Sequence, residues 1–278
     1  MFRQLIIHAD DYGLSQSVSR GILQVIDQQT VTSTSIMANS SCFHQVCEWL
    51  EKRPSLDLGI HLNFTWGIPL CDPKDISSLV DGAGKFHSSP ALYARALLGR
   101  IKKEHVYKEG KAQMEKVFAR KLNITHIDSH HHAHVLPGLC EAVADLALEY
   151  RVSFVRSLTS QKHWVADGPL SRRIFLGQMP GAHRQFWTKK GLFTVGCLKG
   201  CDLGGNQKNL LVCWDKFLTL LPEGVTEVMV HPGYVDDLIG DSYREGRLKE
   251  IDLLCDPRFK KMIKKADISL IGFSHLLK

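Results

Sequence analysis

The sequence lacks several features that would place it in a specialised class of protein. No run of apolar residues approaches the ~18 needed to cross a bilayer, and the apolar stretch near the N-terminus is too short for a signal peptide. None of the 8 cysteines forms a C-x-x-C pair, and disulfide frameworks are typical of short secreted chains, not of chains of 278 residues. We therefore expect a cytoplasmic protein with buried thiols and no stable membrane insertion.

A basic stripe interleaved with aromatic residues is also missing. The formal net charge is +6, and apart from short runs such as 258–265 the lysines and arginines are scattered. Short basic runs are typical of a solvated helix face, so we expect no nucleic-acid partner. The oligomeric state stays open, with a homodimer as one option.

The composition is that of an ordinary globular protein, with 44% hydrophobic and 23% charged residues. Short apolar runs, which predict strands, lie at 5–9, 32–37, 56–62, 124–128, 152–156, 225–230 and 268–272. Amphipathic stretches predict helices at 17–28, 43–51, 91–103, 105–121, 139–150, 209–221, 244–254 and 257–265.

The alternation of strands and helices predicts an α/β fold with a parallel sheet and helices outside it. Seven expected strands favour a closed or nearly closed (β/α) barrel. No linker divides the chain, so we predict one domain over residues 1–278. Residues 66–90 are expected to form a long loop, and 158–206 an irregular insertion.

Polar residues that could carry chemistry follow four of the expected strands. Asp10 and Asp11 come after the first strand and His61 lies at the end of the third. A histidine-rich run over 128–134 follows the fourth, and His231 follows the sixth. Because the carboxyl ends of parallel strands share one rim of a barrel, we expect these side chains to converge.

Such a rim could hold a divalent cation through one carboxylate and two imidazoles. A second carboxylate could take a proton from water, and a separate histidine could protonate a leaving group. Alternation along an extended segment would place Asp128, His130, His132 and His134 on one side. Periodicity alone does not choose the ligand among these three histidines.

Four motifs together resemble one known family, the YdjC-like carbohydrate deacetylases. They are His-Ala-Asp-Asp-Tyr-Gly at 8–13, Gly-Ile-His-Leu-Asn at 59–63, Thr-His-Ile-Asp-Ser-His-His-His-Ala-His at 125–134, and His-Pro-Gly at 231–233. Each motif is weak alone, but four in this order are specific. The resemblance implies an irregular seven-stranded (β/α) barrel and hydrolysis of the N-acetyl group of an amino sugar to free amine and acetate.

The resemblance also implies roles for individual residues. Asp11, His61 and His130 would hold a divalent metal ion, with magnesium and zinc both open. Asp10 would be the general base that deprotonates the attacking water. His231 would be the general acid that protonates the departing amine.

Three further residues are predicted to contact the substrate: Tyr12, Trp66 and Arg156. Arg156 matches a basic position of the family and would orient either Asp10 or the substrate. Other rings that could stack on a sugar are Phe86, Trp164, Phe186 and Trp187. Tyr12 stands where the family usually has Phe, and His8 where Asn is common, and neither change predicts inactivation.

Two other functions stay open. One is a different metal-dependent hydrolase on the same barrel, an amidohydrolase or a phosphoesterase. Amidohydrolase-type barrels usually carry H-x-H on the first strand, whereas this strand ends in Asp-Asp. The other is a non-catalytic sugar-binding protein. The sequence does not name the sugar, and residues 158–206 match the family poorly.

Overall fold

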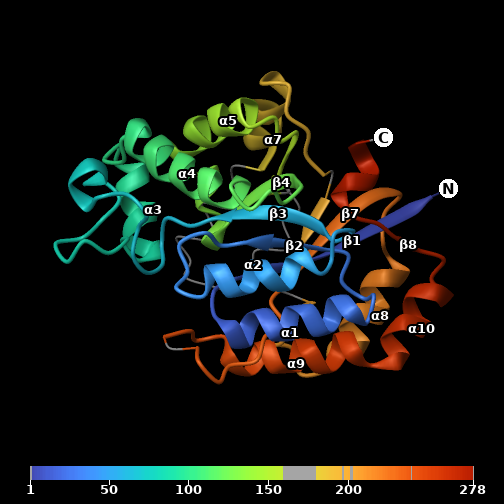
Figure 1. Cartoon of the computed structure of the whole chain (residues 1–278). Helices are drawn as coiled ribbons and strands as arrows, with labels where there is room; N and C mark the ends of the chain where they lie inside the picture. The colour runs from blue at the N-terminus through green and yellow to red at the C-terminus, as the bar shows by residue number, and fades with distance from the viewer. Residues whose placement is uncertain (1, 159–179, 196, 201–202, 239, 278) are drawn as a thin grey trace.

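A curled sheet of parallel strands forms the centre of the computed structural model, which describes residues 2–158, 180–195, 197–200, 203–238 and 240–277 (Figure 1). The strands are β1 (Arg3–Tyr12), β2 (Ser33–Ile36), β3 (Asp57–Leu62), β4 (Ile124–Ser129), β5 (Phe154–Val155), β6 (Cys197–Lys199), β7 (Gly224–Val230) and β8 (Ser269–Leu270). Their order is β5-β4-β3-β2-β1-β7-β6, with β8 beside β1. The predicted α/β class with a parallel sheet is confirmed.

Helices surround the curled sheet and pack against one face of its strands. They are α1 (Gln16–Asp27), α2 (Phe43–Glu51), α3 (Ser89–Leu97), α4 (Lys103–Phe118), α5 (Leu139–Glu149), α7 (Pro180–Lys189), α8 (Leu210–Thr219), α9 (Arg244–Cys255) and α10 (Pro257–Lys265), with short 3-10 turns η1 (Pro73–Ile76), η2 (His130–Val135) and η4 (Phe273–Leu277). In Figure 1, α1, α2 and α9 lie below the sheet, and α4, α5 and α7 above it. The helices bury their apolar stripes against the strands, as in other α/β folds.

The register of the sheet fixes which side chains meet at its carboxyl edge. β1 pairs with β7 from Arg3–Gly224 up to Ala9–Val230. The residues that follow the last pair, Asp10 and His231, are therefore neighbours at the same edge.

A second pairing places another acid at this edge. Among the strands on the other side of β1, His61 of β3 is paired directly with Asp128 of β4. These pairings follow from the apolar runs themselves, because a shift of one residue would turn the buried faces of the strands outward.

The barrel prediction is confirmed only in part. The sheet curls, and a single parallel bridge from Phe154 of β5 to Phe193 brings its β5 edge to the segment that precedes β6. A complete seven-stranded barrel is not confirmed, since the described residues contain eight strands. The additional strand, β6, has only 3 residues and is too short to give a periodic signal.

The described part of the segment 158–206, for which irregular structure was predicted, contains α7 and β6, and residues 159–179, 196 and 201–202 lie outside the described residues. The strand prediction at 152–156 shrinks to the 2 residues of β5. The expected loop at 66–90 contains η1 and an antiparallel bridge between Val80 and Phe86. Most other predicted helices and strands are found with shifts of a few residues at their ends.

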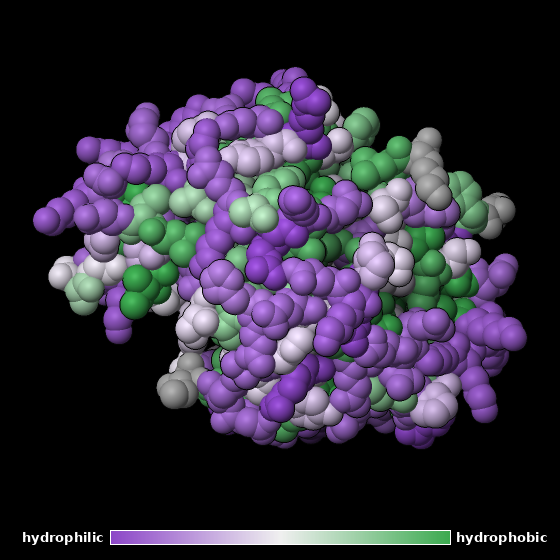
Figure 2. Space-filling model, in the orientation of Figure 1, coloured by the Kyte–Doolittle hydropathy of each residue, from purple (hydrophilic) through white to green (hydrophobic). Residues whose placement is uncertain are grey.

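The face of the molecule drawn in Figure 2 is mostly hydrophilic, with hydrophobic residues in smaller areas between hydrophilic ones. Within the described part of the chain, no helix combines the length and the apolar character that a membrane span requires.

Candidate active site

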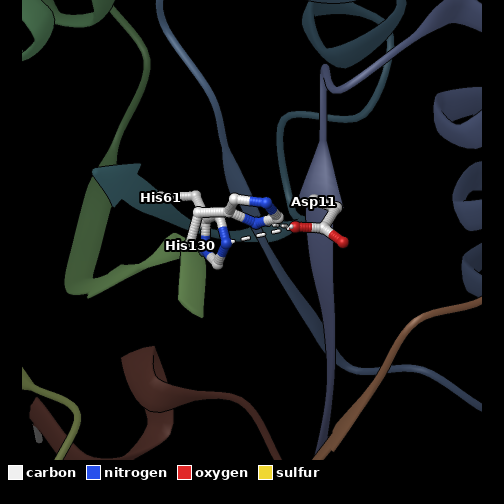
Figure 3. Close-up of side chains that lie close together, drawn as sticks. All are labelled: Asp11, His61 and His130. Atoms are coloured by element: carbon white, nitrogen blue, oxygen red, sulfur yellow. Dashed lines mark hydrogen bonds and ion pairs between the residues drawn. The ribbon is translucent and has the colours of Figure 1, made fainter. Parts of the chain in front are cut away.

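Three side chains from distant parts of the sequence converge at the carboxyl edge of the sheet. Asp11 comes from β1, His61 from β3, and His130 directly follows β4 (Figure 3). One ligand atom from each lies within 4.8 Å of the other two. The predicted trio is therefore brought together, in an arrangement able to hold a metal ion.

The backbone turns sharply to bring Asp11 into this position. The pairing of β1 with β2 is irregular between Ala9 and Tyr12, and Asp11 has φ 72°. A non-glycine residue in this left-handed region is strained, and such strain concentrates at functional sites. Asp11 Oδ1 lies 2.8 Å from His130 Nδ1 and 3.3 Å from His61 Nε2.

His61 is oriented by hydrogen bonds to its other ring nitrogen. Nδ1 lies 2.8 Å from Asp128 Oδ1 and 3.1 Å from Ser35 Oγ. With Nδ1 donating to the carboxylate, the neutral ring would present a lone pair on Nε2 to a cation beside Asp11, as in carboxylate–histidine–metal triads. Nε2 is buried and makes no hydrogen bond to any described residue, so this donor set fits a cation.

Charge near His61 also favours its protonated form when no cation is present. Burial lowers the pKa of His61, but the carboxylates of Asp128 and Asp11 outweigh burial and raise it to about 10. A cation binding at Nε2 would therefore displace a proton, which makes metal affinity depend on pH.

Asp10 lies beside the trio and is held by Arg156. The guanidinium Nη1 and Nη2 each lie 2.8 Å from one Asp10 carboxylate oxygen, and Arg156 also pairs with Asp128 at 2.8 Å and Glu227 at 2.7 Å. Burial by itself would raise the pKa of Asp10, but Arg156 reverses this and holds it below its ordinary value. Asp10 is therefore a carboxylate at neutral pH.

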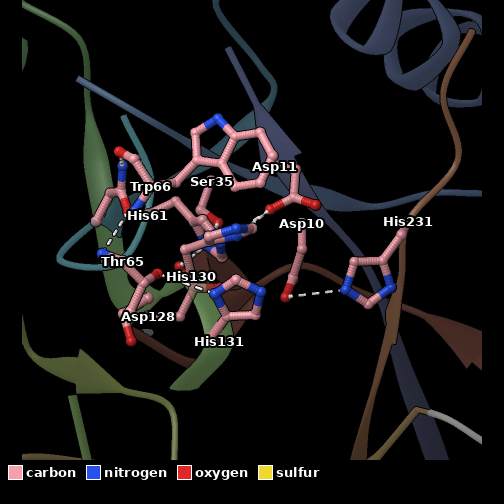
Figure 4. A network of polar contacts seen from close by, with 12 residues as sticks. Asp10, Asp11, Ser35, His61, Thr65, Trp66, Asp128, His130, His131 and His231 are labelled. Carbon is pink, nitrogen blue, oxygen red and sulfur yellow. Dashed lines mark hydrogen bonds and ion pairs between the residues drawn. The ribbon is translucent and has the colours of Figure 1, made fainter. Parts of the chain in front are cut away.

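His231, which directly follows β7, faces Asp10. Its Nε2 lies 3.8 Å from Asp10 Oδ2, and its side chain is 32% exposed. In Figure 4 the two aspartates lie between His231 and the pair of His61 and His130. The site thus has two imidazoles on one side of the carboxylates and a solvent-accessible imidazole on the other.

These groups open into a pocket of about 580 Å³, within the 300–1,000 Å³ typical of small-molecule sites. Trp66 forms part of its wall, and the indole ring lies 6.2 Å from the ring of His130. Thr65 and His131, joined by a 2.9 Å contact, also line it. A flat apolar ring beside polar groups is a suitable surface for a sugar.

The chain is similar to proteins of one known family. The family described as YdjC-like protein matches residues 4–265. The chain belongs to the YdjC-like family. A carbohydrate deacetylase from Brevibacillus brevis is 31% identical over 276 residues, which cover 98% of this chain and 99% of the relative. A chitooligosaccharide deacetylase from Yersinia enterocolitica is 29% identical and covers 99% of this chain, with 99% of its own length matched.

A solved structure of a protein from Enterococcus faecalis V583, assigned to cellobiose-phosphate cleavage, superimposes on this YdjC-like chain with a TM-score of 0.80. The two are 24% identical, with 99% of each chain covered. At this level of identity the likeness shows a shared fold.

The three histidines that the sequence offered as candidate metal ligands, His130, His132 and His134, lie in different places in the structure of this YdjC-like protein. The expected alternation from Asp128 to His134 was wrong, because the strand ends at Ser129 and the following residues form η2, with positive φ at His131 and His132. His134 lies fully buried, with its two ring nitrogens 2.6 Å from Ser129 Oγ and 2.9 Å from Arg156 O. Only His130 of the three lies with Asp11 and His61 in the metal-compatible cluster.

Two of the three predicted substrate contacts lie outside the pocket. Tyr12 is fully buried and donates a 2.8 Å hydrogen bond to Val46 O, so its side chain cannot reach a ligand in the pocket. Arg156 is only 2% exposed and faces carboxylates, which favours the orientation of Asp10 over substrate contact. Trp66 does line the pocket.

The other candidate rings also differ from expectation. Phe86 and Trp187 are buried in the hydrophobic core, and Phe186 packs against that core. None of the three lines the pocket. Trp164 lies outside the described residues.

Some residues around the site had no predicted role. Asp128 lies in the histidine-rich motif, and its function became visible only through its pairing with His61. Glu227 is a charged residue inside an apolar strand, which is a signal for a buried partner, here Arg156. Arg247 and Glu250 come from α9, far from any strand end, and no sequence pattern points to them.

Proposed function

We propose that this protein is a metal-dependent carbohydrate N-deacetylase. It would hydrolyse the N-acetyl group of an amino sugar to free amine and acetate. The observation that carries this proposal is the cluster of Asp11, His61 and His130. Asp10 lies beside this cluster, His231 lies beside Asp10, and all of these side chains line one pocket of the size of a sugar site. Relatives named carbohydrate deacetylase over nearly the whole chain support the same reaction.

Asp11, His61 and His130 would hold a divalent cation, with magnesium and zinc as the candidates. When bound there, the cation would act as a Lewis acid on the acetyl carbonyl and lower the pKa of a nearby water. Two imidazoles favour zinc, whereas a carboxylate with several waters also suits magnesium.

Asp10 would act as the general base. Its pKa is held low by Arg156, so it is ionised and can accept a proton from the water that attacks the acetyl carbon. Arg156 occupies one direction at each carboxylate oxygen, and each oxygen has a second lone pair for the transferred proton. Arg156 would thus be a positioning residue for Asp10.

His231 would act as the general acid. As the bond between the acetyl carbon and nitrogen breaks, its imidazole would donate a proton to the departing nitrogen, which leaves as the free amine. The acetyl carbon keeps the oxygen delivered by water and leaves as acetate. The half-exposed position of His231 gives it access both to substrate and to solvent, from which it can regain its proton.

Trp66 would bind the apolar face of the sugar ring, and Thr65 and His131 would offer polar contacts beside it. The substrates that fit this reading are chitooligosaccharide-like sugars or glycolipid-linked N-acetylglucosamine. One relative named chitooligosaccharide deacetylase supports the first class.

The test is a screen of metal-stripped protein for acetate release. N-acetylglucosamine, its disaccharide and a lipid-linked form are supplied with magnesium or zinc, and phosphoesters serve as competing substrates. We expect acetate release that is lost with a chelator and restored by the metal. Asp11→Asn and His130→Ala should each lower kcat at least about 100-fold, because losing a metal ligand costs more than the 10–100-fold lost with a residue that only orients a ligand.

His44→Ala is the matched control, since His44 lies exposed on α2 and should leave kcat unchanged. Full activity in both site variants would refute the assigned roles. Cleavage of phosphoesters with no acetate released from any sugar would replace the deacetylase with a phosphoesterase.

A further inference from the structure

We infer that Arg247 is a positioning residue that fixes the carboxylate of Asp11 and the turn of His231 in one arrangement. The inference builds on the cation site of the proposed function. Arg247 lies on α9, 236 residues from Asp11 along the chain, and belongs to none of the sequence motifs.

Three donor groups of the Arg247 side chain reach three different partners. Nη2 lies 2.7 Å from Asp11 Oδ2, Nε lies 2.6 Å from Asp241 Oδ2, and Nη1 donates to the backbone carbonyl of His231 at 3.3 Å. The side chain is only 4% exposed. A planar guanidinium can serve three fixed acceptors at once, whereas a lysine ammonium is a single point.

The two carboxylate oxygens of Asp11 contact different partners. Oδ2 is taken by Arg247, and Oδ1 alone faces His61 and His130. Rotation of the carboxylate would leave the buried guanidinium without this partner, which is costly in a site of low dielectric. Arg247 therefore directs one defined oxygen of Asp11 toward the cation position.

The turn at His231 is held from two sides by the same helix. Arg247 donates to the His231 carbonyl, and Glu250, one turn further along α9, accepts a hydrogen bond from the His231 backbone N–H. Asp241 extends this network to the pocket rim, because its Oδ1 accepts from the backbone N–H of Tyr243 at 2.7 Å. One helix thus sets the distance between the ligand Asp11 and the proposed acid His231.

The test compares cobalt(II) binding in Arg247→Gln, Arg247→Lys and Lys249→Met variants of the full chain. Lys249 lies on the same helix and pairs with Glu245 at the surface, so it controls for changes to α9. Cobalt affinity is measured by calorimetry, the absorption spectrum of bound cobalt reports ligand geometry, and circular dichroism reports folding. Acetate release gives kcat and KM separately.

We expect cobalt to bind Arg247→Gln about 10–100-fold more weakly, as for other residues that orient a metal ligand, and with an altered spectrum. kcat should fall more than KM rises. Arg247→Lys should recover part of the affinity, and Lys249→Met should match the parent protein.

A folded Arg247→Gln with parental cobalt affinity and spectrum overturns the inference, because a merely structural role would change thermal stability alone. If Arg247→Gln does not fold, the cobalt affinity and the cobalt spectrum of Arg247→Lys test the inference instead. If Arg247→Gln loses cobalt affinity and the parent protein itself releases no acetate from any sugar, the role of Arg247 is upheld and the deacetylase is refuted.

Discussion

Replacement of Asp128 by Asn separates the orientation of His61 from its presence. Asp128 is fully buried, and its carboxylate lies 2.8 Å from His61 Nδ1 and 2.8 Å from Arg156 Nη1. His61 shares a hydrogen bond with Oδ1, and Arg156 forms an ion pair with Oδ2. Asn keeps the shape of Asp but offers only one accepting oxygen, so its amide group must face one of these two partners.

Two effects of Asp128→Asn can be given magnitudes. If the amide faces His61, the ring proton moves to Nε2 and that nitrogen no longer has a lone pair for a cation. Metal affinity should then fall about 10–100-fold, or about 1.4–2.8 kcal/mol. In either orientation the buried ion pair with Arg156 loses its negative charge, which costs up to about 3–5 kcal/mol of folding free energy, and the cost is highest when the amide NH₂ group faces Arg156.

The assay for Asp128→Asn combines zinc titration calorimetry with thermal unfolding of the metal-free protein. Asp145→Asn is the control, because Asp145 pairs with Lys103 at the surface and should change stability by at most about 1 kcal/mol. A folded Asp128→Asn protein that binds zinc as tightly as the parent would show that His61 does not need this carboxylate.

Two further substitutions test the pocket and the core. Trp66→Ala should raise KM for a sugar substrate about 2–12-fold, corresponding to the 0.5–1.5 kcal/mol of an aromatic contact, while kcat changes less. Trp66→Phe should retain most of the affinity. An unchanged KM of Trp66→Ala in steady-state kinetics would show that Trp66 does not contact the sugar. Tyr12→Phe should lower the unfolding free energy, measured by denaturant titration, by about 1–3 kcal/mol, because Val46 O loses its buried donor. KM should stay unchanged. A raised KM in a Tyr12→Phe protein that is shown to be folded would mean that Tyr12 contacts the substrate.

Much of the fold could be predicted because its apolar runs are continuous. The helix over 43–51 and the helix over 257–265 have the predicted bounds, and α1 begins at a serine cap, where Ser15 accepts from Val18 N. The short strands could not be predicted. β6 and β5 owe their hydrogen bonds to neighbours on β7 and β4, which local sequence does not describe.

Some residues of the candidate site could likewise be predicted from the sequence, and others could not. Asp10, Asp11, His61, His130 and His231 were predictable because they follow strong strand signals within family motifs. Tyr12 was misassigned as a substrate contact because sequence adjacency to Asp11 says nothing about direction, and the irregular turn at Asp11 sends the two side chains apart.

The sequence by itself determined the chemical types at the strand ends, since apolar periodicity specifies where each strand stops and which polar residue follows. The tertiary structure decided which of these groups touch. His130 rather than His134 joins the cluster because the chain leaves the strand at Ser129, and Arg247 reaches Asp11 because α9 packs beside α1. Contacts between such distant residues depend on how helices pack on the sheet, and that packing is a property of the whole chain that no local pattern encodes.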